Sequence, residues 1–592
     1  MDLGASSKAI LRNGKKLRRQ LRELPNLREF RIAVLGGSTT DEFVDFLEIE
    51  LLSNGIRPTF YQSEYGAYFE EAVLSPSTLA AFRPQLVVVY TTVRNIRLDD
   101  DYGASEERFQ QRLEAEYQRY VAIWDSIEQT IGCEIIQNTF DPPLYRILGN
   151  LDASHPAGAV RFVNALNCRF AEAAASRSRL RLNDLSSLAS QLGVEQWRDL
   201  PRWFSYKLAH TPAAHLEIAR SVGASITSAL FGSKKCLVLD LDNTLWGGVI
   251  GDDGVDKIRL GRESADAEAF VEFHEYCLRL RSRGILLAVC SKNNHDIAME
   301  GLRHPDSVLR PEHFAAIRAN WLPKDENIRS IAEELNIGVD SLVFVDDNPA
   351  ERALVAAQLP TVGVPEVGSD VSQFAAVVES YRFFETTAVS GEDLVRSSQY
   401  QANTERVLAG AAYQNYGEYL SSLEMSADIG GFKAPYLERI AQLVNKTNQF
   451  NLTTRRLSHS EVLEIAADST QVAIYGRLAD KFGDNGLVTV VQARVLDGVA
   501  HVELWLMSCR VLKRELEAAM LDVLVERCAV AGASAIHGLY IPTAKNAMVA
   551  DHYSRLGFRK VEEERTDGAT NWYLEVAGYT PRNKHIQIER SA

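Results

Sequence analysis

The segment KKCLVLDLDNTLWGG (residues 234–248) decides the fold of the central part of the chain. Its apolar run at 236–239 is typical of a buried strand, and Asp240 and Asp242 follow it directly, with Thr244 just beyond. Open α/β sheets carry their chemistry at the carboxyl ends of their strands. Two carboxylates there could act on a phosphate, one attacking phosphorus while the other moves a proton. A solvated acidic turn after a core strand is the alternative interpretation.

Three further motifs follow in the order that a phosphate site requires: the strand 285–290 ending at Ser291 and Lys292, the helix start at Lys324, and the strand 341–345 ending at Asp346 and Asp347. The first offers a hydroxyl and an adjacent amide to phosphate oxygens, and the second a cation for the phosphate and the nucleophile. The third can complete a Mg²⁺ site, because Mg²⁺ prefers oxygen ligands and shares them with substrate phosphate.

These four strand-end motifs resemble the haloacid dehalogenase (HAD) superfamily of aspartyl-phosphate enzymes, over roughly residues 233–385. The resemblance implies a Rossmann-like α/β domain with Asp240 as nucleophile and Asp242 as general acid/base. It further implies phosphate or charge contacts at Thr244, Ser291, Lys292 and Lys324, and a Mg²⁺ site made by Asp240, Asp242, Asp346 and Asp347.

The intervals between these motifs leave little room for a lid domain. About 48 residues separate Asn243 from Ser291 and about 33 separate Ser291 from Lys324, which single helices with their strands and loops can fill. The glycine-rich piece 246–254 predicts only a small flap. An open site suits a phosphate that is presented on a large partner, because the partner itself can exclude water.

Length and composition bound the remaining possibilities. A chain of 592 residues with 46% apolar content predicts several α/β domains with ordinary cores. The net charge of −15 disfavours nucleic acid as the main partner, and no apolar run of membrane-spanning length or signal-peptide pattern appears. Seven cysteines without paired spacing indicate a reducing compartment. We therefore expect a cytoplasmic protein, with residues 1–29 as an amphipathic helical leader.

Residues 30–230 predict another α/β domain, of the flavodoxin type. Its pattern resembles the SGNH hydrolases, which carry their site residues in four blocks; the matching positions here are Ser38, Gly66, Asn95 and His210. The family's aspartate, three residues before its histidine, would fall on Lys207. A Ser–His pair without its orienting carboxylate loses most of its activity. A non-hydrolytic docking domain and an esterase both stay open, the former being favoured.

Residues 386–429 predict a polar helical connector, and residues 430–592 an α+β domain. The order of strands and helices and the Leu-Gly-Phe ending at 556–558 resemble the GNAT acyltransferases, in which a central strand splays from its neighbour and admits a pantetheine arm. The glycines of that family's pyrophosphate loop are missing, since Lys513 and Arg514 occupy their region. Close approach of a CoA pyrophosphate is therefore disfavoured, whereas a single phosphodiester of a carrier protein is compatible.

Cys509 stands at the end of the predicted central strand, beside Arg510 and near a helix start. Both neighbours would stabilise a thiolate, the form that attacks carbonyl carbon. The alternative is a small apolar residue of a buried strand.

Four stretches together resemble the FkbH family: 240–254, NKTNQFN (445–451), MSCRV (507–511) and PTAKN (542–546). Members load a glyceryl unit onto an acyl carrier protein for polyketide assembly. The resemblance implies D-1,3-bisphosphoglycerate as substrate, Cys509 as acyl acceptor, removal of the 3-phosphate at Asp240, and transfer to the phosphopantetheine thiol of the carrier. Lys446, Asn448 and Arg510 are candidate contacts to the phosphoglyceryl group or the carrier.

Two other functions stay open. The chain could be an acyl-CoA-dependent acyltransferase fused to a Mg²⁺-dependent phosphatase, or a docking scaffold in a synthase complex with inactive sites. The complete set of acidic residues at the first site disfavours the scaffold.

Overall fold

The computed structural model describes residues 7–98, 101–389, 391–394, 396, 399–400, 402, 406, 413, 415–447, 449–543, 545–561 and 568–590. The chain divides into two compact units, one ending at Ser228 and the other beginning at Ala229. The boundary falls close to the predicted one. None of the helices in the described residues is both long and apolar enough to cross a membrane.

The N-terminal unit is built on a parallel sheet of five strands in the order β2-β1-β3-β4-β5. This is the flavodoxin-type order of a doubly wound sheet, which the sequence predicts. The central strands are buried at nearly every position because helices cover both faces. The strands are β1 (Arg28–Gly36), β2 (Ile56–Gln62), β3 (Leu86–Tyr90), β4 (Glu134–Asn138) and β5 (Leu180–Asn183).

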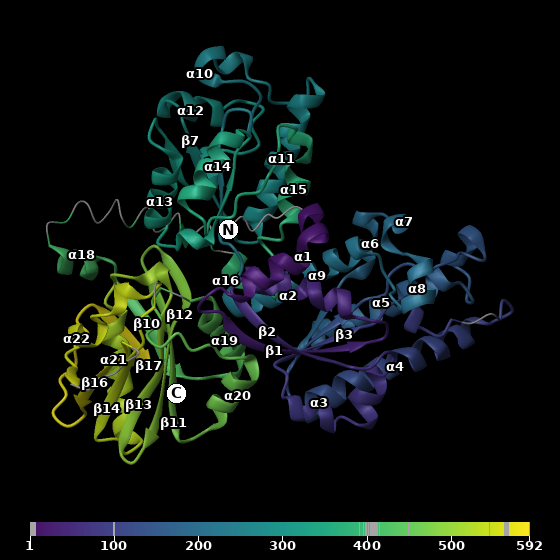
Figure 1. Ribbon diagram of the computed structural model, residues 1–592. Coiled ribbons are helices and arrows are strands. Elements are labelled where there is room, and N and C mark those ends of the chain that lie inside the picture. Colours follow the sequence, from purple (N-terminus) through teal and green to yellow (C-terminus); the bar gives the residue numbers. More distant parts are fainter. Residues whose placement is uncertain are drawn as a thin grey trace. The chain divides into compact units, whose positions relative to one another are not determined.

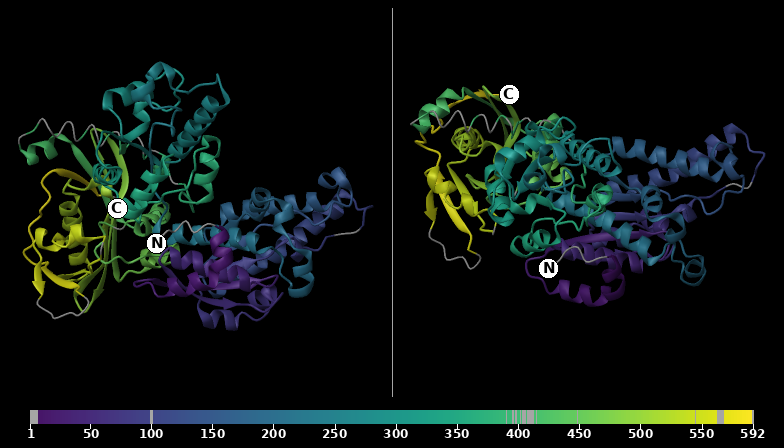
Figure 2. Two further views of the ribbon diagram at one scale, coloured as in Figure 1. Left: turned by 45° about the horizontal axis from the view of Figure 1, so that its top comes forward. Right: turned by 90° about the horizontal axis from the view of Figure 1, so that it is seen from above.

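Helices lie on both faces of this sheet (Figures 1 and 2). One face is covered by α3 (Ser77–Phe82), α4 (Glu106–Thr130) and α5 (Ala159–Ser176), whose apolar side chains share one core with the sheet. The opposite face carries α2 (Asp41–Ser53) and α9 (Pro212–Phe231).

The predicted leader is the helix α1 (Ser7–Arg22), and it packs on α2 as part of the N-terminal unit. Its Ile10 and Leu21 are buried beside Ile49 and Leu52 of α2. The helix therefore uses its apolar stripe for the core of this unit and presents its basic face outward.

The second unit contains a parallel four-stranded sheet in the order β8-β7-β6-β9, which confirms the predicted strands. Every residue of β6 is buried, as expected for a strand covered on both faces. The strands are β6 (Cys236–Leu239), β7 (Leu286–Ser291), β8 (Phe314–Ala319) and β9 (Leu342–Val345). One face packs on α11 (Ala265–Ser282), α12 (His295–Leu302) and α15 (Phe374–Ser380), the other on α13 (Lys324–Glu334) and α14 (Pro349–Gln358).

The same unit contains an eight-stranded, mostly antiparallel sheet in the order β15-β16-β14-β13-β12-β11-β10-β17. Its strands are β10 (Met425–Gly431), β11 (Gln471–Asp480), β12 (Gly483–Leu496), β13 (Val499–Met507), β14 (Ala535–Tyr540), β15 (Arg559–Val561), β16 (Thr570–Glu575) and β17 (Ile586–Arg590). The strand β10 falls within the segment 386–429 expected as a connector, so this sheet begins earlier than predicted.

Helices flank this sheet as well. The helix α21 (Leu516–Val530) packs on one face, and α19 (Leu437–Lys446) and α20 (His459–Ala467) pack on the other. The segment before the Leu-Gly-Phe ending forms a 3₁₀ turn at Ala547–Val549 and the short helix α22 (His552–Arg555).

Strands β13 and β14 form a parallel pair that ends before either strand does. Their pairing runs from Val499–Ala535 to Val502–Gly538, while β13 continues to Met507 and β14 to Tyr540. The two strands therefore separate beyond this point. This is the splay that the GNAT resemblance leads us to expect.

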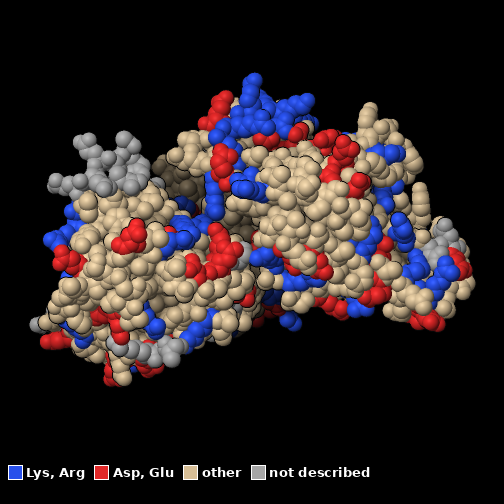
Figure 3. Space-filling model, turned by 90° about the horizontal axis from the view of Figure 1, so that it is seen from below, with Lys and Arg blue, Asp and Glu red and all other residues tan. Residues whose placement is uncertain are grey.

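Figure 3 displays one face of the molecule, with basic and acidic side chains interspersed over most of it and one group of basic side chains at its upper edge. This face therefore carries charges of both signs.

Candidate active site

Three carboxylates meet at the carboxyl edge of the four-stranded sheet. Asp240 follows β6 and Asp346 and Asp347 follow β9, the neighbouring strand. The amide of Asp240 donates to the carbonyl of Val345 at 3.0 Å, which holds the two strand ends together. One oxygen from each of the three carboxylates lies within 4.8 Å of the others. The sequence predicted this meeting because parallel neighbours end at the same edge.

Lys324, the first residue of α13, enters this group of carboxylates. Its side chain is almost fully buried, and its Nζ lies 2.9 Å from Oδ1 of Asp240 and also forms an ion pair with Asp346. Burial by itself would lower the pKa of Lys324, but the two carboxylates outweigh it and raise the pKa above its usual value. The ammonium is therefore charged throughout the physiological range.

One ammonium does not balance three carboxylates. Burial, and then the charge of Asp240, raise the pKa of Asp346 to about 6, and the same two causes raise the pKa of Asp347. The crowded oxygens fit a divalent cation that takes oxygen ligands. Asp240, Asp346 and Asp347 would hold Mg²⁺, which when bound supplies positive charge to the phosphate oxygens.

Asp242, predicted as a fourth metal ligand, lies outside this group of carboxylates. Its Oδ1 accepts from the indole of Trp246 at 2.8 Å and the amide of Ile250 at 3.1 Å, and its Oδ2 from Asn293 at 3.2 Å. Burial raises the pKa of Asp242 above its usual value. A fixed carboxyl with a raised pKa suits the acid/base role predicted for it.

The other predicted phosphate contacts fall into two groups. Thr244 and Ser291 are buried at the same edge, and Oγ1 of Thr244 accepts from the amide of Asp347 at 3.2 Å. Lys292, in contrast, places its Nζ 2.6 Å from Glu351 of α14. The structure thus gives Lys292 a carboxylate partner, and its contact with phosphate stays a prediction.

Arg352 is a further residue of this site that the sequence reasoning did not identify. Its side chain is buried and donates to the carbonyls of Asp346 and Asp347 at 2.8 Å each. Asn348 caps α14 and donates its amide to Oδ1 of Asp346 at 2.8 Å. Together they fix the acidic turn in place. A sequence signal exists only for Asn348, which precedes a proline in the pattern of a helix start.

The segment between Asn243 and Lys324 is described in full and forms no separate lid domain. The predicted flap contains the single-turn helix α10 (Ile250–Asp253), and Gly247 pairs with Arg259. The indole of Trp246 is buried against Gly301 of α12, which anchors the flap to the domain.

The structure describes the backbone of Cys509, the predicted thiol, but not its side chain. Cys509 opens a 3₁₀ turn (Cys509–Val511) directly after β13, and its side chain is outside the described residues, as are the side chain of Lys446 and all of Asn448. Arg510 is buried and donates to Oγ of Ser508 at 3.2 Å and to Gln399. Its guanidinium is thus enclosed by protein.

Three of the motifs quoted above lie side by side at the end of β13. The amide of Met507 donates to the carbonyl of Phe450 at 3.1 Å, and Nδ2 of Asn546 donates to the carbonyl of Asn451 at 2.9 Å. The segments 445–451, 507–511 and 542–546 therefore share one place in the fold. Only the packed structure reveals this, because the segments are far apart in sequence.

The four positions predicted from the SGNH resemblance lie around the loop after β1. The amide of Gly66 donates to the carbonyl of Gly36 at 3.1 Å, and Nδ2 of Asn95 donates to the carbonyl of Gly37 at 2.9 Å. Both candidate oxyanion donors are thus bonded to backbone. Ser38 is buried, and its hydroxyl has no hydrogen-bond partner among the described residues.

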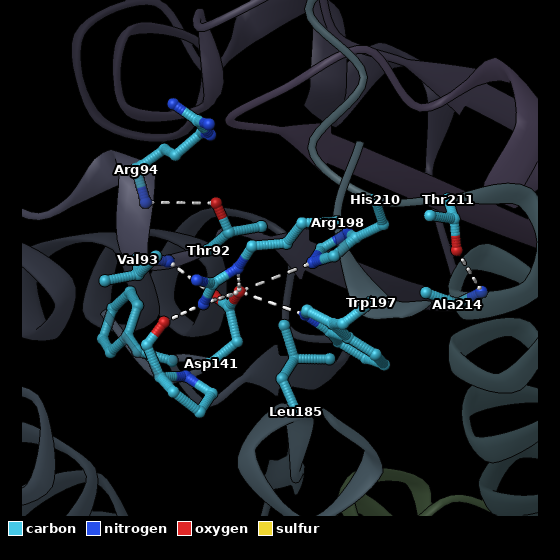
Figure 4. Close-up of polar contacts among 12 residues, drawn as sticks. Thr92, Val93, Arg94, Asp141, Leu185, Trp197, Arg198, His210, Thr211 and Ala214 are labelled. Atoms are coloured by element: carbon cyan, nitrogen blue, oxygen red, sulfur yellow. Dashed lines mark hydrogen bonds and ion pairs between the residues drawn. The ribbon is translucent and has the colours of Figure 1, made fainter. Parts of the chain in front are cut away.

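His210 is fully buried, and its two ring nitrogens lie near Tyr90 and Asp141. Its Nδ1 lies 3.0 Å from the Tyr90 hydroxyl, and its Nε2 lies 3.9 Å from Oδ2 of Asp141, at the end of β4 (Figure 4). The expectation that His210 has no nearby carboxylate is wrong, because the fold brings Asp141 to it from another strand. The two nitrogens face Tyr90 and Asp141, an arrangement unsuited to a serine nucleophile.

Comparison with solved structures supports the assignment of the central site. The N-terminal part of a Bacteroides fragilis protein, which contains a phosphatase domain and was crystallised with Mg, is 27% identical to this chain. The match covers 63% of this chain and 99% of that one, with a TM-score of 0.59.

Acetyltransferases also match part of the chain. A ribosomal-protein alanine N-acetyltransferase from Escherichia coli is 14% identical over 27% of this chain and 99% of its own, with a TM-score of 0.21. A spermidine N-acetyltransferase from Vibrio cholerae is 10% identical over 26% and 96%, with a TM-score of 0.20. These likenesses are too weak to bear on function. No protein-family model matches the chain, and no curated protein matches it significantly. The site geometry and the Mg-bound relative together support a phosphatase domain.

Proposed function

We propose that this chain is a Mg²⁺-dependent phosphatase coupled to an acyl transferase, which loads a glyceryl unit from D-1,3-bisphosphoglycerate onto an acyl carrier protein. The observation that carries the proposal is the cluster of Asp240, Asp346 and Asp347 around the ammonium of Lys324. A buried nucleophile with its charge partner and a metal-type acidic group serves phosphoryl transfer.

The phosphatase step uses two carboxyl groups in succession. The carboxylate of Asp240 attacks phosphorus, the bond from phosphorus to the glyceryl oxygen breaks, and Asp242 gives that oxygen its proton. Water then attacks the aspartyl phosphate, Asp242 takes a proton from the water, and inorganic phosphate leaves. Burial of Asp242 raises its pKa and so favours the protonated form that the first half requires.

The transfer step is assigned to the end of β13, where the three motif segments meet. An acyl phosphate is already activated, so a thiolate at Cys509 forms the thioester bond while the bond from carbon to phosphate oxygen breaks. The phosphopantetheine thiol of the carrier protein then takes the acyl group and releases the cysteine. The splay of β13 from β14 beyond Val502 supports entry of an extended pantetheine arm there.

An acyl-CoA-dependent transferase is the second candidate, and one contact weighs against it. The guanidinium of Arg514, in the loop before α21, is buried and paired with Asp480 at 2.9 Å. A cation that a carboxylate already holds is a poor receptor for the pyrophosphate of CoA.

The test is incubation of the chain with the bisphosphoglycerate, Mg²⁺ and a holo carrier protein, followed by intact-mass analysis of both proteins. We expect a glyceryl adduct on the carrier. Asp240→Asn should stop at the phosphoglyceryl thioester, and Cys509→Ser should abolish loading while phosphate release from other monoesters continues.

Two results would contradict the proposal. Transfer from acyl-CoA with no dependence on the bisphosphoglycerate would favour the acyl-CoA enzyme. Absence of Mg²⁺-dependent phosphate release by the parent chain would favour a scaffold with inactive sites.

A further inference from the structure

Two cations of the N-terminal unit gather at one indole ring near the carboxyl edge of its sheet. The Cζ of Arg94 lies 4.0 Å from the centroid of the Trp203 ring, and the Nζ of Lys207 lies 5.5 Å from that of the same ring. Within the described residues, neither side chain forms an ion pair with a carboxylate. Two cations gathered at one indole repel each other, and an anion between them would relieve that repulsion.

The nearby carboxylate, Asp141, is committed elsewhere. Its Oδ2 accepts from the indole of Trp197 at 3.1 Å and from Arg198 at 3.0 Å, and its Oδ1 from the amide of Val93 at 2.9 Å. Figure 4 shows the Arg94 side chain directed away from Asp141, whereas Arg198 reaches it. Arg198 therefore pairs with Asp141, whereas Arg94 and Lys207 have no carboxylate in an ion pair with them among the described residues.

A buried, unpartnered hydroxyl lies on the loop after β1, which is hydrogen-bonded to Asn95 and to Lys207. The loop holds Ser38, which is 2% exposed and whose Oγ has no hydrogen-bond partner among the residues described. On one side of it, the carbonyl of Gly37 accepts from Asn95, the neighbour of Arg94. On the other side, the amide of Thr39 donates to the carbonyl of Lys207 at 3.0 Å. A buried hydroxyl without a partner is costly unless a ligand satisfies it.

The position in the sheet is the one at which doubly wound sheets bind ligands. Ser38 follows β1 and Arg94 follows β3, and these strands are neighbours in the order β2-β1-β3. The chain leaves β1 toward β2 on one side and β3 toward β4 on the other, which makes this the point where the strand order reverses and where doubly wound sheets bind ligands.

We propose that this edge of the N-terminal sheet binds a small phosphorylated molecule, whose phosphate contacts Arg94, Lys207 and the hydroxyl of Ser38. A guanidinium with its fork of donors, an ammonium and a hydroxyl together provide the donors that phosphate oxygens accept. Lys207 occupies the position at which an SGNH hydrolase would carry its aspartate. The site therefore has a positive charge where those hydrolases have a negative one. The site binds its ligand without hydrolysing it, because His210 is directed at Tyr90 and Asp141.

The test is calorimetric titration of the full-length chain with inorganic phosphate, alongside Arg94→Gln/Lys207→Gln and Lys15→Gln/Lys16→Gln. The control pair removes the same charge from exposed positions of α1. We expect the first pair to weaken binding at one class of phosphate site about tenfold or more, and the control to bind like the parent. Phosphatase activity, which depends on the other unit, should be equal in all three. Circular dichroism and thermal unfolding of each variant report whether the N-terminal unit is folded.

Unchanged phosphate binding by a folded Arg94→Gln/Lys207→Gln chain would overturn the proposal. If the double variant does not fold, the single variants Lys207→Gln and Ser38→Ala are used instead, because Lys207 is partly exposed and removing one hydroxyl disturbs the fold little. Undiminished phosphate binding by both single variants would equally overturn the proposal. A parallel titration with acetate tests the ligand class, and acetate binding as tight as that of phosphate would refute the assignment to phosphate. Release of p-nitrophenol from its acetate ester in a Ser38-dependent manner would contradict the non-hydrolytic role.

Discussion

The Nζ of Lys324 lies 2.9 Å from Oδ1 of Asp240, the carboxylate proposed to attack phosphorus. Asp346 shares the same ammonium from the neighbouring strand. Lys324, Asp240 and Asp346 are all buried, so both ion pairs lie in a medium that screens charge poorly. Lys324 therefore places a positive charge beside the nucleophile and reduces the repulsion among three neighbouring carboxylates.

Lys324→Met should lower both activity and stability. Removing one partner of a buried ion pair leaves uncompensated charge and costs about 3–5 kcal/mol in the free energy of unfolding. We expect phosphatase turnover to fall at least about a hundredfold, as for the loss of other preorganised charges at transition states. Lys292→Met is the matched control, because its ammonium pairs with Glu351 at the rim. Equal losses in the two variants would refute the specific role of Lys324.

The stabilising effect of Mg²⁺ should increase with pH. Asp346 has a pKa of about 6 in the folded chain, above its ordinary value of 3.8. Without metal, the stability that this group contributes is present below about pH 4 and is lost as the pH rises through 6. Because Mg²⁺ competes with the proton for Asp346, the rise in Tm on adding Mg²⁺ should be small at pH 5 and larger at pH 7.5.

Thermal unfolding with and without Mg²⁺ at the two pH values measures this difference. Asp347→Asn, which removes one carboxylate of the group, should reduce the rise in Tm at both. A larger rise at pH 5 than at pH 7.5 would be inconsistent with the predicted ligand set.

Arg352→Gln should weaken Mg²⁺ binding without removing a metal ligand. The buried guanidinium holds the carbonyls of Asp346 and Asp347, and loss of such supporting contacts typically costs about 10–100-fold in metal affinity. The Mg²⁺ concentration for half-maximal phosphatase activity measures the effect. Glu366→Gln is the control, because Glu366 is an exposed partner of the same arginine and should change that concentration little.

Asn546→Ala should disrupt the place where the three motif segments meet. Its Nδ2 donates at 2.9 Å to the carbonyls of both Asn451 and Ile541, and stranding buried partners costs about 1–3 kcal/mol each. We expect a lower Tm for the C-terminal sheet and a loss of carrier loading, with phosphatase turnover of a small monoester retained. Loss of turnover together with loading would show that the two sites are not separable in this way.

Local sequence determined the elements of the phosphatase site. Apolar runs bounded by polar residues define β6, β7 and β9, and parallel strands covered on both faces must end at a shared edge. The positions of Asp240, Asp346 and Asp347 follow from this pattern, and that of Lys324 from a helix start; their roles follow from the resemblance to the HAD superfamily.

Tertiary packing decided which partner each polar group meets. Asp242 is bonded to Asn293 and lies outside the acidic cluster; Lys292 pairs with Glu351; and Asp141 reaches His210 from another strand. Short-range periodicity fixes strands and helices because it reports which face of the backbone is buried. It carries no information about pairs separated by 50 residues or more, whose contacts arise only when the layers pack and each buried polar group must find a partner.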